Sequence, residues 1–324
     1  MDIERRQPAV QRRQRRWLQF SLRTLLIFVT LASCAAGWLG MKFREARRQQ
    51  ANVAAILEVG AEVQYDYEFD AQGNETPDAK PPGAAWLHSL LGDDFFRSVY
   101  RVELMGSNVR QVTDADLAYL AEFTHLRALS VWGGPSISVA GLKYVRALTR
   151  LKLLNLDTTQ VTDADLEDLA QLTELEHLSL RDTRVTSAGL EHLKGLTQLR
   201  WLDLSNTTVS DSGLENLNRI SQLDWLRLDG TRITDAGIER LTGLSQIRHL
   251  LLNKTHVTDV GLKALEGLTQ LESLELVDTQ VSDAGLEHLK RLTRLQELTV
   301  WRTRVTHAGL IELKKALPDC LMYL

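Results

Sequence analysis

One short phrase recurs nine times between residues 112 and 310 at an almost constant spacing. Each copy holds an aliphatic residue, then Thr or Ser, usually Asp, usually Ala, usually Gly, and then Leu or Ile. One interval is 25 residues long and the other seven are 24. A fixed period of this length indicates stacked supersecondary units, because each unit has an apolar face that only its neighbours can bury. The chain is therefore predicted to form a solenoid, with copies beginning at Val112, Ile137, Val161, Val185, Val209, Ile233, Val257, Val281 and Val305.

Each unit is predicted to run as helix, turn, strand and turn. In the copy at 185–208, Leu190 and Leu193 suit one face of a short helix, whereas Leu202 and Leu204 alternate as in a strand. The hydroxyl and carboxylate residues before the helix have side-chain oxygens that can accept hydrogen bonds from its first amides. The aspartates of this set are therefore interpreted as helix caps, namely Asp114, Asp163, Asp211, Asp235, Asp259 and Asp283.

The pattern L-x-x-L-x-L-x-x-T-x-V-T-D-A-G-L-x-x-L resembles the leucine-rich-repeat superfamily over roughly residues 99–324. It is similar to the repeats of eukaryotic F-box substrate receptors and of bacterial membrane-anchored leucine-rich-repeat proteins. The resemblance implies an α/β solenoid with a parallel concave sheet and short convex helices. Ten parallel strands are expected, from Val99 to the segment at Leu321.

The chain departs from the superfamily at one ladder position, which carries Thr instead of the usual Asn or Cys. A hydroxyl can donate to and accept from backbone groups, so these threonines are predicted to be structural and to bond adjacent coils. They are Thr159, Thr183, Thr207, Thr231, Thr255, Thr279 and Thr303.

A membrane anchor is predicted at residues 24–41, which hold no charge and would extend about 27 Å as a helix. Seven arginines precede this segment and four basic residues follow it. The positive-inside rule then favours a cytoplasmic N-terminus and extracytoplasmic repeats, as in a single-pass protein of a bacterial envelope. Two alternatives place the repeats on the same side: a lipoprotein lipidated at Cys34, or a cleaved signal peptide.

The chain is accordingly divided into an arm, an anchor, a cap, the repeats and a second cap. The N-terminal cap is expected to contain a short helix at 44–57, a strand at 61–69 and a helix at 85–91, with Trp86, Leu90, Phe95 and Phe96 covering the first coil. No compact helical module precedes the repeats, which counts against an F-box-like substrate receptor. The divisions are 1–23 (basic cytoplasmic arm), 24–41 (transmembrane anchor), 42–98 (juxtamembrane segment and N-terminal cap), 99–315 (repeats) and 316–324 (C-terminal cap).

Charge is distributed unevenly along the chain. Residues 1–48 hold eleven basic and three acidic residues, a net charge of +8, against −4 for the whole chain, so residues 49–324 carry −12. The basic end suits an anionic membrane surface, whereas the acidic remainder argues against nucleic acid as a partner. With only Cys34 and Cys320 present, no internal disulfide is expected.

Variable residues between the strand leucines are predicted to form columns on the concave face. The third-place column holds four consecutive ring side chains, His177, Trp201, Trp225 and His249, which we interpret as the centre of a binding surface for a protein, a peptide or a glycan. The alternative is that these rings only stack on one another. The flanking candidates are Arg181, Asp203, Arg227 and Asp229, which would set polarity, and the seventh-place tryptophans Trp132 and Trp301.

The sequence predicts a binding protein without enzymatic activity. It contains no G-x-x-x-x-G-K-[ST], G-x-S-x-G, H-E-x-x-H or C-x-x-C motif, so we expect no cofactor, no metal site and no catalytic residues. His177 and His249 would lie about 14 Å apart by strand spacing, too far for one ion. Asp203 and Arg227 are expected to form a cross-strand ion pair. The alternative function is a structural envelope protein whose solenoid self-associates or contacts the cell wall, and the oligomeric state is left open.

Overall fold

The computed structural model describes residues 22–70, 73–76, 79–104, 112–132 and 139–324. Most of the predicted basic arm and the repeat position Ile137 lie outside these residues. The chain divides into two compact units, residues 1–46 and 47–324.

A single helix, α1 (Leu22–Val59), contains both the predicted anchor and the predicted helix at 44–57. Its apolar part is long enough to cross a membrane by length and composition, and none of that stretch is buried within the protein. In residues 24–41, aliphatic and aromatic side chains such as Ile27, Phe28 and Trp38 are more than half exposed. A helix with apolar residues on all sides and no protein packed against them matches what a bilayer would solvate.

The second unit is built on one eleven-stranded sheet whose strands follow the order of the sequence. β1 (Glu62–Tyr65) runs antiparallel to β2 (Val99–Leu104). From β2 onward the neighbouring strands are parallel, which confirms the predicted ten-stranded parallel ladder. The remaining strands are β3 (Ala128–Val131), β4 (Leu153–Asn155), β5 (His177–Ser179), β6 (Trp201–Asp203), β7 (Trp225–Arg227), β8 (His249–Leu251), β9 (Ser273–Glu275), β10 (Glu297–Thr299) and β11 (Leu321–Tyr323).

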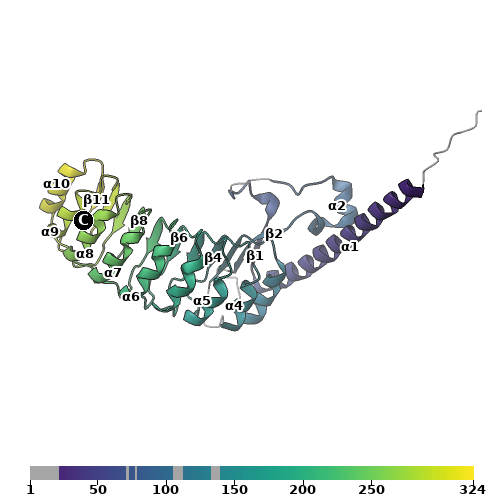
Figure 1. Cartoon of the computed structure of the whole chain (residues 1–324), viewed down its shortest axis with the longest axis horizontal. Helices are drawn as coiled ribbons and strands as arrows, with labels where there is room; N and C mark the ends of the chain where they lie inside the picture. The colour runs from purple at the N-terminus through teal and green to yellow at the C-terminus, as the bar shows by residue number, and fades with distance from the viewer. Residues whose placement is uncertain (1–21, 71–72, 77–78, 105–111, 133–138) are drawn as a thin grey trace, which may run out of the picture. The chain divides into compact units, whose positions relative to one another are not determined.

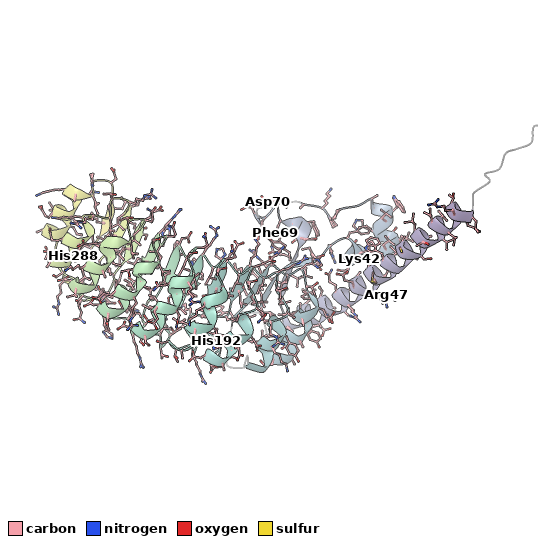
Figure 2. The ribbon with its side chains drawn as sticks, in the orientation of Figure 1. Lys42, Arg47, Phe69, Asp70, His192 and His288 are labelled. Atoms are coloured by element: carbon pink, nitrogen blue, oxygen red, sulfur yellow. The ribbon has the colours of Figure 1, made fainter. Side chains whose placement is uncertain are left out.

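Short helices on the return path of each coil form the outer side of the repeats, and the strands form the inner side (Figure 1). His192 and His288, both on this helical side, are visible in Figure 2. The α-helices are α2 (Ala85–Leu91), α3 (Asp114–Leu117), α4 (Val139–Val145), α5 (Leu166–Leu169), α6 (Asp211–Leu214), α7 (Asp235–Arg240), α8 (Asp259–Ala264), α9 (Asp283–Leu289) and α10 (His307–Ala316). The 3-10 helices are η1 (Asp66–Glu68), η2 (Asp93–Phe95), η3 (Ala118–Glu122), η4 (Asp163–Asp165), η5 (Gly189–Gly195), η6 (Glu215–Arg219), η7 (Leu241–Gly243) and η8 (Leu265–Gly267).

One continuous aliphatic core runs through the repeats between the sheet and the helices. In the copy at 185–208, the exposed fractions of Leu190, Leu193, Leu202 and Leu204 are all 0%. Each coil therefore contributes a slice of core that is completed by the coils above and below it, as the repeat predicts.

The hydroxyl residue of the repeated phrase, not the aspartate, caps helices α7, α8, α9 and α10. Thr234 and Thr258 are N-cap residues, and their side chains accept hydrogen bonds from the backbone amides of Ala236 and Val260. The aspartate that follows bonds the next coil instead. Asp211 accepts the N–H of Thr234 at 2.8 Å and its hydroxyl at 2.6 Å. The interpretation as caps is therefore wrong for five of the six aspartates, because the stacked coils bring an N–H and a hydroxyl to each carboxylate. These five are Asp163, Asp211, Asp235, Asp259 and Asp283.

The glycine of the phrase makes room for that aspartate. A Cβ added to Gly237 would stand 2.3 Å from Asp211 Oδ1, and one added to Gly285 would stand 2.4 Å from Asp259 Oδ1. Asp116 and Asp165 occupy the glycine position in their own copies. Asp116 has no copy before it, and the copy before Asp165 has Val139 where the aspartate would be. Glycine is thus needed where the preceding coil presents a carboxylate.

Six of the seven ladder threonines are buried, Thr303 is half-buried, and the hydroxyls of all seven bond within their own coil. The hydroxyl of Thr207 donates to the carbonyl oxygen of Leu204 at 2.7 Å, and that of Thr231 donates to Leu228 at 2.6 Å. Their structural role agrees with the prediction, but the expected bond to an adjacent coil is not what the hydroxyls make. Each one closes the turn after its own strand.

The first coil is capped by the end of α1 and by β1, not by the helix at 85–91. Val53, Ile56 and Val59 from α1 join the core of the repeats. In contrast, Trp86 is 65% exposed and Leu90 is 68% exposed, so the prediction that these two cover the first coil is wrong. Phe95 and Phe96 are half-buried but pack against each other, with ring centroids 5.1 Å apart. A long helix ending beside the first strand offers a more continuous apolar face than a seven-residue one.

At the other end of the repeats, Leu317 and Cys320 are buried in the core and β11 adds the last parallel strand. Burial raises the pKa of the Cys320 thiol to about 11, which keeps it protonated and unreactive at neutral pH. Ile311 and Leu321 remain more than half exposed on this last coil.

Candidate binding surface on the sheet

The predicted third-place column exists as a single register row across the sheet. His177 pairs with Trp201, Trp201 with Trp225, and Trp225 with His249. Parallel neighbours at identical register place these four rings side by side, about 4.8 Å apart from strand to strand. The sequence pattern therefore located the column correctly, because the alternation of leucines fixes which residues face outward.

The four rings are not equivalent in their contacts. Trp225 and His249 stack with ring centroids 4.2 Å apart and planes inclined by 25°. Within the described residues, Trp201 makes no comparable ring contact, and His177 is exposed. Stacking therefore accounts for one pair only, and Trp201 presents a half-buried indole without a ring partner.

A cavity of about 180 Å³ lies on this row beside Trp201. Leu153, His177 and Trp201 line it together with Asn155 and Ser179. Although the side chain of His177 is exposed, desolvation by neighbouring atoms lowers its pKa, so the neutral imidazole does not add a charge to this apolar hollow at pH 7. The cavity offers apolar walls with an amide and a hydroxyl, which suits a small apolar side chain of a partner.

The charged candidates lie further along the strands. Arg227 bonds the carboxylate of Asp229 through Nε at 2.6 Å, while its Nη1 lies 3.9 Å from Asp203 Oδ2. The expected pair between Asp203 and Arg227 is therefore the looser of the two, and the same-strand partner dominates. Burial lowers the pKa of Arg227, but the hydrogen bond and charge of Asp229 outweigh it and raise the pKa overall.

Asp203 is almost fully buried beneath this group. Its Oδ1 accepts the backbone N–H of Ser205 at 2.7 Å. Burial raises the pKa of the Asp203 carboxyl, an effect that Ser205 and Arg227 reduce but do not cancel. Asp203 is thus better placed to hold the start of the turn than to contact a partner.

Side-chain oxygens at the seventh place link successive coils. Asp229 Oδ1 accepts the N–H of Asn253 at 2.9 Å, and Asn253 Oδ1 accepts the N–H of Val277 at 2.7 Å. Asp157 does the same for the N–H of Arg181 at 3.1 Å. Asp229 therefore has a structural task in addition to its ion pair, which the sequence pattern did not indicate.

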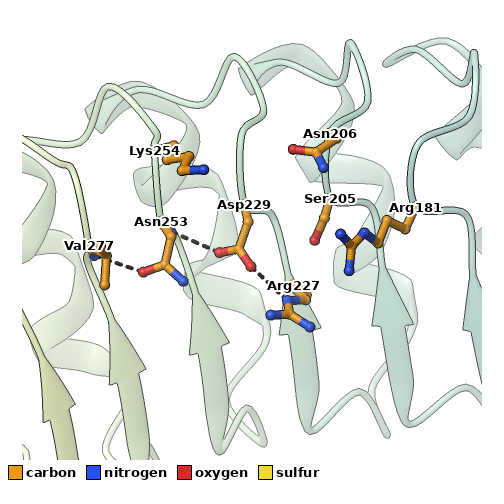
Figure 3. A pocket seen from close by; sticks show the side chains of 8 residues that line it. All are labelled: Arg181, Ser205, Asn206, Arg227, Asp229, Asn253, Lys254 and Val277. Atoms are coloured by element: carbon orange, nitrogen blue, oxygen red, sulfur yellow. Dashed lines mark hydrogen bonds and ion pairs between the residues drawn. The ribbon is translucent and has the colours of Figure 1, made fainter.

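A second cavity, of about 260 Å³, lies beside the seventh-place residues, where the strands lead into the following turns. The sequence-predicted residues that line it are Arg181, Arg227 and Asp229, and the side chains are drawn in Figure 3. Sequence reasoning did not select the five further lining residues, Ser205, Asn206, Asn253, Lys254 and Val277. Asn206 and Lys254 occupy a turn position with φ of 55° in both cases, one residue after the seventh place. Both residues could have been predicted from the sequence, because they occupy the eighth place of the strand pattern. The predicted columns covered only the third, fifth and seventh places.

Trp132 and Trp301 stand apart from the central rings. They are 48% and 54% exposed and follow β3 and β10, which are seven strands apart, or about 34 Å by strand spacing. The structure therefore brings together the four rings in one row and the four charged residues in two rows, Asp203 with Arg227 inside the strands and Arg181 with Asp229 just beyond the strand ends, but it does not bring these two tryptophans to the rings. Among the described residues, no three His, Cys, Asp or Glu side chains are grouped so that they could hold a metal ion.

Comparison with known proteins identifies the repeat. The leucine rich repeat family matches residues 173–233, and no curated protein matches the chain. Among solved structures, the internalin inlF from Listeria monocytogenes is 23% identical, with 64% of this chain and 70% of that chain covered and a TM-score of 0.47. Internalin C2 from the same organism is 26% identical, with 67% and 87% covered and a TM-score of 0.48.

A leucine-rich-repeat protein from Leptospira interrogans is 19% identical, with 64% of this chain and 51% of that chain covered and a TM-score of 0.51. This chain thus spans about half of that protein. The likeness is one of fold, and it agrees with the parallel sheet and the short helices described above.

Proposed function

Because the chain is a leucine-rich-repeat protein, we propose that it binds a protein or peptide on the inner face of its sheet. The observation that carries the proposal is the row containing Trp201 and Trp225, two large rings on an exposed surface that the core does not need. Aromatic residues at the centre of a surface supply most of the binding energy in many interfaces. The neighbouring apolar cavity and the cavity lined by charged residues give such a surface both shape and polarity.

We also propose that residues 24–41 of α1 anchor the chain in a membrane, with the N-terminus cytoplasmic and the repeats outside. The unburied apolar stretch and the excess of basic residues before it support this orientation. Protease accessibility tests it: in intact spheroplasts, external protease should degrade the repeats, while an epitope fused to Met1 should stay protected. Protection of the repeats in intact spheroplasts would reverse the orientation.

The binding role is tested with the double substitution Trp201→Ala and Trp225→Ala in the full-length chain in nanodiscs. Immobilised protein is exposed to envelope extract, and the captured proteins are identified by mass spectrometry. Loss of the specifically captured protein with a nearly unchanged unfolding temperature supports recognition by the rings. The matched control is Trp86→Ala, an exposed tryptophan outside the sheet, which should retain capture.

A fall in the unfolding temperature of the double variant by 10 °C or more, which is on the order of 5 kcal/mol for a domain of this size, would instead make the rings part of the packing. Equal capture by the double variant and the wild type would remove the inner face from the proposal.

Self-association is a second candidate, favoured by the apolar surface of the last coil. Ile311 and Leu321 are exposed there, and a cavity of about 410 Å³ is lined by Leu310, Ile311 and Met322 among others. Light scattering on the full-length chain in detergent distinguishes the two roles. A monomer at micromolar concentration favours recognition, whereas a dimer that Ile311→Asp dissociates favours a structural assembly.

A further inference from the structure

We propose that the cavity lined by Arg181, Ser205, Arg227 and Lys254 binds one carboxylate group of the partner. This inference rests on the proposed binding role of the inner face and gives its polar row a specific task. Three cationic side chains and one hydroxyl line the same hollow from four successive coils, those of β5, β6, β7 and β8. Figure 3 shows the Ser205 hydroxyl between the guanidinium groups of Arg181 and Arg227.

Arg181 and Arg227 each use the Nε–H in a hydrogen bond to a neighbouring carboxylate, and their remaining N–H donors are available to a ligand. Arg181 Nε donates to Asp182 Oδ2 at 3.1 Å, and Arg227 Nε donates to Asp229 Oδ2 at 2.6 Å. The Nη1 of Arg227 is 3.9 Å from Asp203, beyond hydrogen-bond distance. A guanidinium has five N–H donors in a planar fork, so each arginine retains Nη donors that match a carboxylate.

The Ser205 hydroxyl adds a donor from the floor of the cavity. Ser205 is 3% exposed, and its Oγ completes no hydrogen bond within the described part of the chain. The hydroxyl is close enough to the Asp203 carboxyl to lower its pKa, but the two groups lack the geometry of a hydrogen bond. A buried hydroxyl without a partner is uncommon because it loses its bond to water. An anionic oxygen in the cavity would satisfy it.

Lys254 supplies the third cation from the rim. It sits at the left-handed turn position, with φ of 55°, and its backbone N–H is used by the carbonyl of Val277 at 2.7 Å. Among the described residues, its ammonium group makes no hydrogen bond or ion pair. The side chain therefore carries an uncompensated charge at the mouth of the cavity.

The surroundings favour one carboxylate over a phosphate or a polyanion. Asp229 and Asp203 face Arg227, and Asp182 faces Arg181, so two of the three positive charges already have a carboxylate beside them. Residues 49–324 carry a net charge of −12, which repels a strongly acidic partner at long range. A single Asp or Glu side chain in an otherwise neutral or basic segment meets both conditions. The ring row lies four residues earlier on each strand, about 13 Å away, within the span of an extended peptide.

The test uses acetate as the probe and arginine side-chain NMR as the readout. The full-length chain in detergent micelles carries labelled arginine, and the guanidinium signals of Arg181, Arg227 and Arg302 are assigned by substitution with Lys. Acetate should shift the signals of Arg181 and Arg227 in a saturable manner, while sodium chloride at equal ionic strength should not. Arg302 pairs with Asp278 on another coil and should not respond.

Four substitutions are expected to weaken, strengthen or leave unchanged the binding of acetate. Lys254→Gln and Ser205→Ala should each weaken binding by about tenfold, the loss of one hydrogen bond to a charged group. Asp203→Asn removes a neighbouring negative charge and should strengthen it. Arg302→Gln is the matched control for Lys254→Gln, because both residues occupy the left-handed turn position.

The inference fails if acetate produces no saturable shift, if Arg302→Gln weakens binding as much as Lys254→Gln, or if phosphate displaces acetate at equal concentration. These results leave the proposed function standing provided that the Trp201 and Trp225 substitutions still abolish capture. Loss of the binding role would appear as unchanged capture in that double variant, whatever acetate does.

Discussion

Asp235 joins two consecutive coils through both oxygens of its carboxylate, because Oδ1 accepts the N–H of Thr258 at 2.8 Å and Oδ2 accepts its hydroxyl at 2.7 Å. The same arrangement links Asp163 with Thr186, Asp211 with Thr234, Asp259 with Ser282 and Asp283 with Thr306. The recurring Thr-Asp-Ala-Gly phrase is therefore explained by a contact between consecutive coils. One coil contributes the carboxylate, and the next coil contributes the hydroxyl and the glycine.

Removal of one of these carboxylates should destabilise the solenoid. We expect Asp235→Ala to lower the free energy of unfolding by about 2 to 4 kcal/mol, because two donors on Thr258 lose a charged acceptor. Urea unfolding of the full-length chain in detergent measures the change. Glu239→Ala, an exposed position on the same helix, is the control and should lie within about 0.5 kcal/mol of wild type.

The glycine on the other side of the contact should be equally restrictive. Gly237→Ala would place a Cβ against Asp211 Oδ1, so we expect a lower unfolding temperature. Gly267→Ala has open space around the added carbon and should be tolerated. In a double-mutant cycle, Gly237→Ala should cost less in an Asp211→Ala background, and simple additivity would show that the clash is not the cause.

The cap of the first coil gives a third prediction. Ile56 is fully buried against the repeats, so Ile56→Ala should cost about 2 to 5 kcal/mol of stability. Trp86→Ala should change the stability by about 0.5 kcal/mol or less, because the side chain is 65% exposed. The reverse order, measured by chemical unfolding, would return the capping role to the helix at 85–91.

The pH dependence of stability should report the burial of Asp203. Because folding raises the pKa of this carboxyl, the folded chain binds its proton more tightly than the unfolded chain does. Its contribution to stability is therefore fully present below the unfolded pKa and is lost as the pH rises through the folded pKa. Asp203→Asn retains an oxygen for the Ser205 N–H and should be at least as stable as wild type at pH 7.

As the pH falls from 7 toward 4, the stability advantage of Asp203→Asn over wild type should shrink. Unfolding by urea at several pH values measures the difference, with Asp319→Asn at an exposed turn as the control. A growing advantage at low pH would contradict the direction of the shift.

Much of the fold could be predicted from the sequence because the repeat is regular. Leucines such as Leu202 and Leu204 specify which side of each strand is buried, and that alternation placed Trp201 and Trp225 on the correct face and in one register row. The number of parallel strands followed from the same spacing. These predictions depend on local periodicity, which a single sequence carries in full.

Contacts between coils were beyond such reasoning. Asp211 was assigned to its own helix because the amides nearest in sequence are there, whereas the donors nearest in space belong to Thr234, 23 residues later. The prediction of the N-terminal cap was wrong for a similar reason. Nothing in the local sequence around Ile56 or Trp86 indicates which of the two helices packs against the first coil. In the candidate site, Ser205 and Lys254 become relevant only when four successive coils stack beside one another.

The pairing of carboxylate and glycine also restricts the order in which repeats of this kind can follow one another. A repeat with Asp at the glycine position can follow only a repeat that lacks the bridging carboxylate. Asp165 illustrates this, because the preceding repeat has Val139 at the aspartate position. Units are therefore not freely interchangeable, and duplication or shuffling must respect which one stands before which. To lengthen the solenoid by design, repeats should be copied from the segment between Asp211 and Gly309. In this segment every glycine of the phrase from Gly237 onward faces an aspartate of the preceding coil.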